Sequence, residues 1–475
     1  MYKIHFGTSG WRDIMAEGFT FDRVEALTRA VARHLKAKGL APQGVLVGHD
    51  YRFLAEEFTH FAAKVLSSEG IRVYVADEAA PTPALSLVIR ELKLAGGINF
   101  TASHNPALYQ GFKWSNAHGG PATKEEIAPI ERLANQLLES GTAGNAPAGQ
   151  TPAAITTVNP KPSYFKALTK MVPGRILRAA RLKLVADPLF GAGRGYLSVA
   201  LQKAGCRVTV LHDWRDAFFG GNNPEPDAAN LKEAATLMKK TKSRLVLGTD
   251  GDADRFGVVD ADGTFLTPNQ ILALTLYLLV EHRGWTGRVV RSVVSSHLVD
   301  AVAGLYNLPV EVTPVGFKYI GESMLRGGFL TGGEESGGLT IAGHVPEKDG
   351  VLACLLMAEL VAREKRTLGE ILKKLYRRIG RTILSDRINV HLASTAEGEH
   401  LRETLSRNRP ERLAGRKVVR VDTTDGFKYE LDDHTWLAIR LSGTEPVARV
   451  YLEGADAAGL KRLGAAGRAL LSGRA

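Results

Sequence analysis

Short apolar runs alternate with helical patterns through roughly the first 380 residues. Residues 45–47 and 73–75 are such runs, and residues 56–68 between them have helical spacing. This alternation predicts parallel α/β layers, because a helix must carry the chain back between parallel strands. Two further cycles follow, over residues 182–247 and 271–362, and all three look like copies of one unit. A chain of 475 residues also exceeds what one hydrophobic core usually organises.

The end of the chain has a different pattern. A stretch over residues 140–162, rich in Ala, Gly, Pro and Thr, has no apolar periodicity and is read as a connector at which the first domain ends. Beyond Gly380 several strands and two helices follow in the order of a smaller α+β domain. We therefore predict four domains, namely three α/β domains over residues 1–155, 156–258 and 259–378, and an α+β domain over residues 379–475.

The net charge of +11 favours anionic partners such as phosphorylated substrates or nucleic acid. The densest basic stretch, residues 363–381, is typical of an amphipathic helix with a solvated charged face, so we expect no nucleic-acid role for it. Its apolar positions are Leu368, Ile371, Leu372 and Leu375.

The chain has no apolar run long enough to cross a membrane and no signal-peptide pattern at its start, which predicts a cytoplasmic protein without a membrane partner. Cys206 and Cys354 stand far apart, so we expect two buried thiols rather than a disulfide or a zinc site.

Residues 96–106 form an apolar strand that leads into a polar loop with the sequence T-A-S-H-N-P. Ligands of α/β sheets bind outside the carboxyl ends of strands, which makes Ser103 a candidate nucleophile. A hydrolase pairing with His104 is disfavoured because the G-x-S-x-G elbow is absent. The other interpretation is a turn whose polar side chains satisfy backbone groups before Pro106.

Three carboxylates, Asp250, Asp252 and Asp254, follow the next cycle's strand at alternate positions. Like charges so close together repel each other, and a cation would stabilise them. A calcium EF-hand loop is excluded, since Arg255 and Ala261 stand where it needs glycine and an acid. Three carboxylates leave coordination positions for water or phosphate, which fits magnesium. A solvated acidic turn is the alternative.

Two weaker motifs come later in the chain. Glu334 and Ser336 in G-G-E-E-S-G-G suit hydrogen bonding to sugar hydroxyls. The segment R-L-S-G-T-E-P offers guanidinium, hydroxyl and free backbone groups for a phosphate, through Arg440, Ser442, Gly443, Thr444 and the following Arg449. An ordinary glycine-rich turn and an ordinary hairpin are the alternatives. Dinucleotide, P-loop and H-E-x-x-H motifs are absent from the sequence.

Taken in order, the loops T-A-S-H-N-P, D-G-D-A-D-R, G-E-E-S-G and R-L-S-G-T-E-P resemble the marks of the α-D-phosphohexomutase superfamily, across essentially the whole chain. The early G-T-S-G-W-R segment resembles that superfamily's start. The resemblance implies a heart-shaped molecule with three mixed-sheet α/β domains, a fourth domain like the TATA-binding protein, and one active site in a central cleft. Each loop would come from a different domain.

The resemblance also implies reversible transfer of a phosphate between C1 and C6 of a hexose. Ser103 would carry the phosphate, glucose 1,6-bisphosphate would be the intermediate and activator, and Mg²⁺ would bind Ser103 and the three aspartates. Arg12 and Arg255 would lie near the phosphoserine, and His104 or, by preference, Lys113 would move the proton. The implied substrate contacts are Gly316, Lys318, Glu334, Ser336, Lys348, Arg440, Ser442, Gly443, Thr444 and Arg449. Monomer and homodimer are both compatible with the resemblance.

The identity of the sugar depends on finer similarities. Residues 119–122, 313–319, 334–336 and the E-K-D-G segment at 347–350 are more similar to phosphoglucomutases than to phosphomannomutases. The T-E-P ending at 444–446 instead resembles dual-specificity enzymes. Glucose is therefore favoured, with phosphomannomutase or dual specificity as the alternative and phosphoglucosamine mutase as a less similar one. A non-catalytic phosphosugar binder would need neither Ser103 nor the aspartates, whereas slow loss of the phosphate to water stays open.

Overall fold

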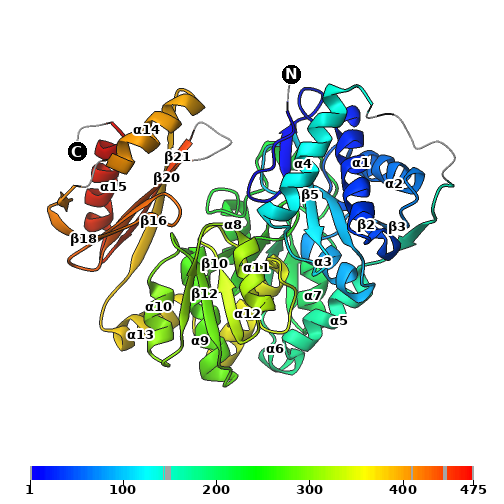
Figure 1. The fold of residues 1–475 in the computed structure, drawn as a ribbon. Coiled ribbons are helices and arrows are strands. Elements are labelled where there is room, and N and C mark those ends of the chain that lie inside the picture. Colours follow the sequence, from blue (N-terminus) through cyan, green and yellow to red (C-terminus); the bar gives the residue numbers. More distant parts are fainter. Residues whose placement is uncertain (1–2, 143, 145–150, 408–409, 442–446, 473–475) are drawn as a thin grey trace.

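The computed structural model describes residues 3–142, 144, 151–407, 410–441 and 447–472. In these ranges the main strands form four sheets, each built from one stretch of the sequence. Figure 1 shows the first sheet, in blue and cyan, and the last, in orange and red, as two lobes beside the green and yellow middle part. This is the four-domain architecture that the sequence predicts.

The first sheet is mixed, with the strand order β1-β5-β4-β2-β3-β6. β3, β2 and β4 run parallel, and β5 returns antiparallel to β4. Its elements are β1 (Trp11–Ile14), α1 (Phe21–Ala37), η1 (Ala41–Gln43), β2 (Val45–His49), α2 (Ala55–Ser68), β3 (Val73–Ala76), α3 (Thr82–Glu91), β4 (Gly96–Phe100), β5 (Tyr109–Asn116), α4 (Lys124–Glu139) and β6 (Ile155–Val158).

The strand β6 lies within residues 140–162, the stretch that is predicted from the sequence to be a connector. It pairs in parallel with β3 and forms the edge of the first sheet. Its residues are mostly exposed, so they carry no apolar pattern that sequence reasoning detects. The partner strand, and not local periodicity, determines this element.

The second and third sheets have the orders β11-β10-β9-β7-β8 and β13-β12-β14-β15. The second domain contains α5 (Lys161–Met171), α6 (Gly174–Ala180), β7 (Lys183–Asp187), α7 (Leu197–Lys203), β8 (Arg207–Val210), η2 (Phe219–Gly221), α8 (Lys232–Thr241), β9 (Leu245–Thr249), β10 (Phe256–Asp260) and β11 (Phe265–Leu266). The third domain contains α9 (Pro268–Tyr277), η3 (Leu278–His282), β12 (Arg288–Ser292), α10 (Leu298–Gly304), β13 (Val310–Thr313), α11 (Phe317–Leu325), β14 (Phe329–Gly333), β15 (Leu339–Ile341), α12 (Gly350–Glu364) and α13 (Leu368–Ile379).

The first three sheets share one topology. Each has three adjacent parallel strands, in the orders β3-β2-β4, β8-β7-β9 and β13-β12-β14, followed by an antiparallel strand, β5, β10 or β15. The three α/β domains therefore repeat one structural unit, as their alternating patterns predict. Equivalent strands then place their carboxyl ends in equivalent positions, which matters for the site below.

The fourth sheet is antiparallel, in the order β16-β21-β20-β19-β18-β17. Its elements are β16 (Leu384–His391), α14 (Thr395–Arg407), β17 (Arg412–Leu413), β18 (Arg416–Asp422), β19 (Phe427–Leu431), β20 (Trp436–Leu441), β21 (Val447–Gly454) and α15 (Ala457–Leu471). The smaller α+β domain predicted beyond Gly380 is thus confirmed.

One large apolar core runs through the first three domains, and the fourth domain has its own. The core-facing side of α13 is the apolar stripe predicted from the basic stretch, and both cysteines are buried free thiols as expected. A smaller cluster around Val294 and Trp436 joins the third and fourth domains. Among the described helices none has the length and apolar character that a membrane span requires.

Candidate active site

The sequence motifs gather at equivalent ends of equivalent strands. Ser103 follows β4, Asp250 follows β9 and Glu334 follows β14, each at the carboxyl end of the strand that borders the antiparallel partner. Arg440 lies on β20 of the fourth sheet. Each motif therefore comes from a different domain, as the resemblance implies.

A cleft of about 1590 Å³ lies between these segments. The predicted residues that line it are Arg12, His104, Lys113, Arg255, Lys318, Glu334, Ser336, Lys348, Arg440 and Arg449. Ser103 and the three aspartates are buried next to this lining, with Ser103 only 1% exposed. The structure thus brings the nucleophile candidate close to a cleft that is lined by both basic and acidic side chains.

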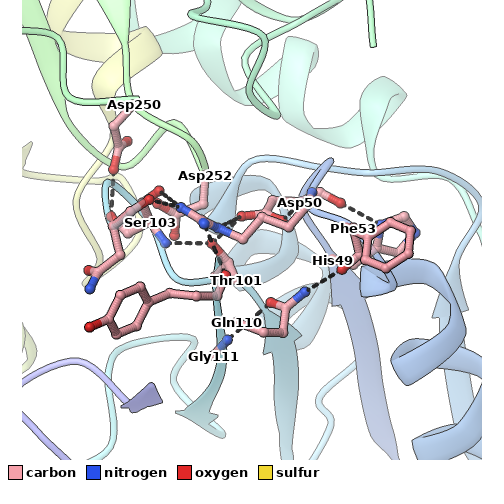
Figure 2. Close-up of polar contacts among 12 residues, drawn as sticks. His49, Asp50, Phe53, Thr101, Ser103, Gln110, Gly111, Asp250 and Asp252 are labelled. Carbon is pink, nitrogen blue, oxygen red and sulfur yellow. Dashed lines mark hydrogen bonds and ion pairs between the residues drawn. The ribbon is translucent and has the colours of Figure 1, made fainter. Parts of the chain in front are cut away.

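Ser103 has an unusual backbone and a close carboxylate partner. Its φ of +52° lies in the left-handed region, which residues other than glycine rarely adopt. Its hydroxyl donates to Asp250 Oδ2 at 2.5 Å (Figure 2). A Cβ atom on Gly251 would lie 2.3 Å from the Ser103 carbonyl oxygen, so glycine is required for this approach of the two loops. The loop T-A-S-H-N-P and the aspartate loop are therefore fitted to each other.

The three aspartates can hold a metal ion. Asp250, Asp252 and Asp254 are fully buried, and one oxygen from each lies within 4.8 Å of the others. Asp252 Oδ1 and Asp254 Oδ1 have no hydrogen-bond partner among the described residues. Burial, with the charges of its two neighbours, raises the pKa of Asp250 well above its usual value. Hard oxygen ligands with two unpartnered acceptors fit a divalent cation such as magnesium.

Two lysines also reach the aspartates. Lys113 Nζ lies 2.5 Å from Asp252 Oδ2 and 2.9 Å from Asp254 Oδ2, and Lys348 Nζ lies 3.0 Å from Asp254 Oδ2. Burial opposes the charge on Lys113, but the two aspartates outweigh it and raise the lysine's pKa. Lys113, from β5 of the first domain, thus joins the nucleophile's domain to the acidic loop of the second.

Two of the basic residues predicted near Ser103, Arg255 and His104, share a partner that sequence reasoning missed. Glu225 lies 3.1 Å from Arg255 Nη1 and 3.7 Å from His104 Nε2. Arg12 donates to Asn105 Oδ1 at 2.7 Å, within the serine loop. Burial, with the charges of Arg255 and Arg12, lowers the pKa of His104 well below its usual value, so its imidazole is neutral at neutral pH. Glu225 belongs to no motif, and nothing in the sequence marks it.

The predicted sugar segment is held by a backbone contact. Glu334 Oε1 accepts a hydrogen bond from the Gly316 amide at 2.7 Å, which joins two of the predicted substrate residues. Burial, together with the charge of Glu335, raises the pKa of Glu334 to about 7. Ser336 and Lys318 line the cleft nearby.

The raised pKa of Glu334 makes the stability of the folded protein depend on pH. Its pKa rises from an ordinary 4.5 to about 7 in the folded chain. The unfolded chain therefore ionises first, and stability falls as the pH rises from about 4.5 to about 7. We expect Glu334→Gln, which keeps a hydrogen-bond acceptor, to stabilise the protein by up to about 2–3 kcal/mol at pH 8 and to give no gain at pH 4.5. Chemical unfolding at both pH values measures this, and equal effects at the two would contradict it.

The structure describes part of the segment that is predicted to bind a phosphate. Arg440 on β20 lies opposite Arg449 on β21, and Asp425 Oδ1 accepts from Arg440 Nε at 3.0 Å. Asp425 Oδ2 accepts from the Val315 amide at 2.9 Å, so this aspartate joins the third and fourth domains. Ser442, Gly443 and Thr444 lie outside the described residues. Two polar residues on β16, Arg387 and Asn389, also line the cleft and were missed from the sequence.

The fold and the cleft together are characteristic of one class of protein. Three copies of a mixed α/β unit and an antiparallel fourth domain surround one cleft, with a serine beside an acidic loop, which is the arrangement of a phosphohexomutase. Family models described as phosphoglucomutase/phosphomannomutase domains I, II and III and C-terminal domain match residues 3–140, 162–263, 267–379 and 393–469. The chain therefore belongs to the phosphoglucomutase/phosphomannomutase family, whose members are isomerases.

Similar proteins carry the names of different sugars. A phosphoglucomutase/phosphomannomutase of Thermococcus kodakarensis is 30% identical, with 94% of each chain covered. A probable phosphoglucosamine mutase of Methanothermobacter thermautotrophicus is also 30% identical, over 94% of this chain and 93% of the other. The crystal structure of a putative phosphomannomutase from Thermus thermophilus is 35% identical, with a TM-score of 0.85 and 99% of each chain covered. The family is thus shown, while the sugar is not.

Proposed function

We propose that this protein interconverts glucose 1-phosphate and glucose 6-phosphate, with Ser103 as the residue that carries the phosphate. The observation that carries the proposal is the Ser103 hydroxyl, which lies 2.5 Å from Asp250 in a buried acidic loop, next to a cleft whose lining includes Arg12, Arg255 and Lys113. Phosphoryl transfer depends on positioning and charge neutralisation, and both are supplied by this arrangement.

In the proposed reaction the phosphorylated serine transfers its phosphate to the free hydroxyl of a hexose monophosphate. A bond forms from the sugar oxygen to phosphorus while the bond to Ser103 Oγ breaks. The hydroxyl proton moves to the neutral imidazole of His104, and Lys113, which its two aspartates keep protonated, can give a proton to the departing Ser103 oxygen. The hexose 1,6-bisphosphate reorients within the cleft and returns its other phosphate to Ser103. Phosphate and protons balance over the cycle, and water takes no part.

Asp250, Asp252 and Asp254 would hold a magnesium ion together with an oxygen of the Ser103 side chain. When bound, the ion would neutralise charge on the transferred phosphate. Arg12 and Arg255 add positive charge on the cleft side of Ser103. The unpartnered buried oxygens of Asp252 and Asp254 support this assignment.

The size of the cleft supports reorientation of a bisphosphate within it. At about 1590 Å³ it exceeds the roughly 300–1,000 Å³ of ordinary small-molecule sites, which leaves room for a hexose bisphosphate to reorient. Glu334 and Ser336 are proposed to read the sugar hydroxyls, and Lys318, Lys348 and Gly316 to complete that side of the site.

Glucose is favoured by the segment similarities described above, and the E-K-D-G segment is part of the cleft through Glu347 and Lys348. The names of the relatives support mannose and glucosamine phosphates as alternative substrates.

The test is turnover of the 1-phosphates of glucose, mannose and glucosamine by purified protein with Mg²⁺, with and without a trace of the matching 1,6-bisphosphate. Intact-protein mass then reports the phosphate on the chain. The proposal requires glucose 1-phosphate to have the highest kcat/KM and the bisphosphate to activate. A higher kcat/KM for another sugar overturns the choice of glucose, and no turnover of any of the three overturns the mutase itself.

A shared phosphate grip for both ends of the sugar is a further expectation. Arg440→Ala deletes a charge-assisted contact, so binding of glucose 1-phosphate and glucose 6-phosphate should weaken alike, by about 1.5–3 kcal/mol. Titration of both monophosphates measures this. The matched control is Arg420→Ala, an exposed arginine on β18 of the same domain. If only one monophosphate binds more weakly, the two orientations use separate phosphate sites.

A further inference from the structure

Arg52 is a buried arginine that none of the motifs contains. It follows β2, its side chain is 0% exposed, and its two terminal nitrogens donate to carbonyl oxygens of the serine loop and the turn after it. The four acceptors are Ser103 O at 2.7 Å, Asn105 O at 2.7 Å, Pro106 O at 2.8 Å and Tyr109 O at 3.1 Å. One side chain therefore holds the loop from the nucleophile candidate onward.

Asp50 completes this arrangement from the opposite direction. Its Oδ2 lies 3.2 Å from Arg52 Nε and accepts from the Thr101 hydroxyl at 2.6 Å. Thr101 Oγ1 in turn accepts from the Ser103 amide at 2.8 Å, as Figure 2 shows. The chain of contacts Arg52–Asp50–Thr101 thus ends on the amide of Ser103, while Arg52 itself reaches its carbonyl oxygen.

Ser103 needs such support because of its backbone. A serine with a φ of +52° stores backbone strain, which persists only when the surroundings determine the conformation. Both polar backbone groups of Ser103 are held by this network, and its hydroxyl is held by Asp250. Removing the charges of Arg52 and Asp50 from water is costly, so the buried pair adds little net stability. That favours a role in positioning a reacting group over a purely stabilising one.

We infer that Arg52, with Asp50 and Thr101, is a positioning residue that keeps the Ser103 hydroxyl aimed at the acidic loop. The inference rests on the proposed function, in which that hydroxyl accepts and returns a phosphate. A lysine cannot replace Arg52, because only the planar guanidinium fork presents donors to several carbonyl oxygens at once. Loss of the network lets Ser103 relax toward an ordinary backbone and moves its hydroxyl.

The test compares Arg52→Lys with Arg29→Lys. Arg29 is a buried arginine of the same domain, paired with Glu25 and Glu69. The rate of Ser103 phosphorylation by glucose 1,6-bisphosphate is followed by quenched intact-protein mass, and kcat and KM are measured with glucose 1-phosphate. In Arg52→Lys we expect phosphorylation and kcat to fall about 100-fold with KM within about threefold, since small misplacements cost this much. In Arg29→Lys we expect only a lower melting temperature.

A second pair of variants covers the case in which Arg52→Lys does not fold. Thr101→Val removes the hydroxyl at nearly constant volume, and Thr101→Ser keeps it. We expect at least about a tenfold slower phosphorylation in the valine variant and a rate near wild type in the serine variant. Equal rates in this pair, or an Arg52→Lys rate within about threefold of wild type, overturn the inference alone. A wild-type chain that turns over none of the three sugar phosphates overturns the proposed function and the inference with it.

Discussion

The Ser103→Ala protein is expected to fold normally and to lose on the order of 10⁴-fold or more of its turnover of glucose 1-phosphate. The transferred phosphate has no resting place without the hydroxyl, and removal of a nucleophile typically has effects of this size. The fold should survive because the hydroxyl makes one hydrogen bond, to Asp250, at the edge of a well-packed domain. Purified protein, assayed with and without glucose 1,6-bisphosphate, gives the measurement.

Intact-protein mass strengthens this experiment. The wild-type chain should gain one phosphate from the bisphosphate, and the alanine variant should gain none. Ser198→Ala is a matched control, because Ser198 is a buried serine on α7 outside the cleft lining. Near-normal turnover in Ser103→Ala would show that another group carries the phosphate.

The second large effect is expected for Asp252→Asn. The change removes one charge from the acidic loop with little change in volume, so magnesium affinity and turnover should fall together. Replacing a residue that only supports the metal ligands typically lowers metal affinity or activity about 10–100-fold. For Asp252 itself we therefore expect a loss of at least about tenfold in both quantities. The fold should survive because the amide oxygen of asparagine can still accept from the Thr82 hydroxyl, now 2.5 Å from Asp252 Oδ2.

Calorimetric titration of Mg²⁺ and turnover as a function of Mg²⁺ concentration measure the two quantities separately. Asp262→Asn is the control, because that exposed aspartate lies in the turn after β10 of the same domain. An unchanged dependence on Mg²⁺ in Asp252→Asn would mean that the acidic loop is only a turn.

Much of the fold was predictable because its signals are local. The cycles of apolar strands and helices, the amphipathic α13 and the change of pattern beyond Gly380 all appear in the structure as predicted. The exposed strand β6 was missed, since it carries no apolar alternation and exists through its pairing with β3. The roles assigned to individual site residues, the domain boundaries and the cytoplasmic location stay predictions.

The sequence by itself determined which side chains stand at the carboxyl ends of β4, β9 and β14, because strand periodicity and loop composition depend on near neighbours in the chain. The tertiary structure alone decided which of them meet. Ser103 and Asp250 are 147 positions apart, and Lys113 and Asp252 are 139 apart, so no local pattern pairs them. Glu225 and Arg52 belong to the site only because the packing of domains and loops carries them there. Long-range packing places partners without leaving a periodic trace, and for that reason these contacts had to be read from the structure.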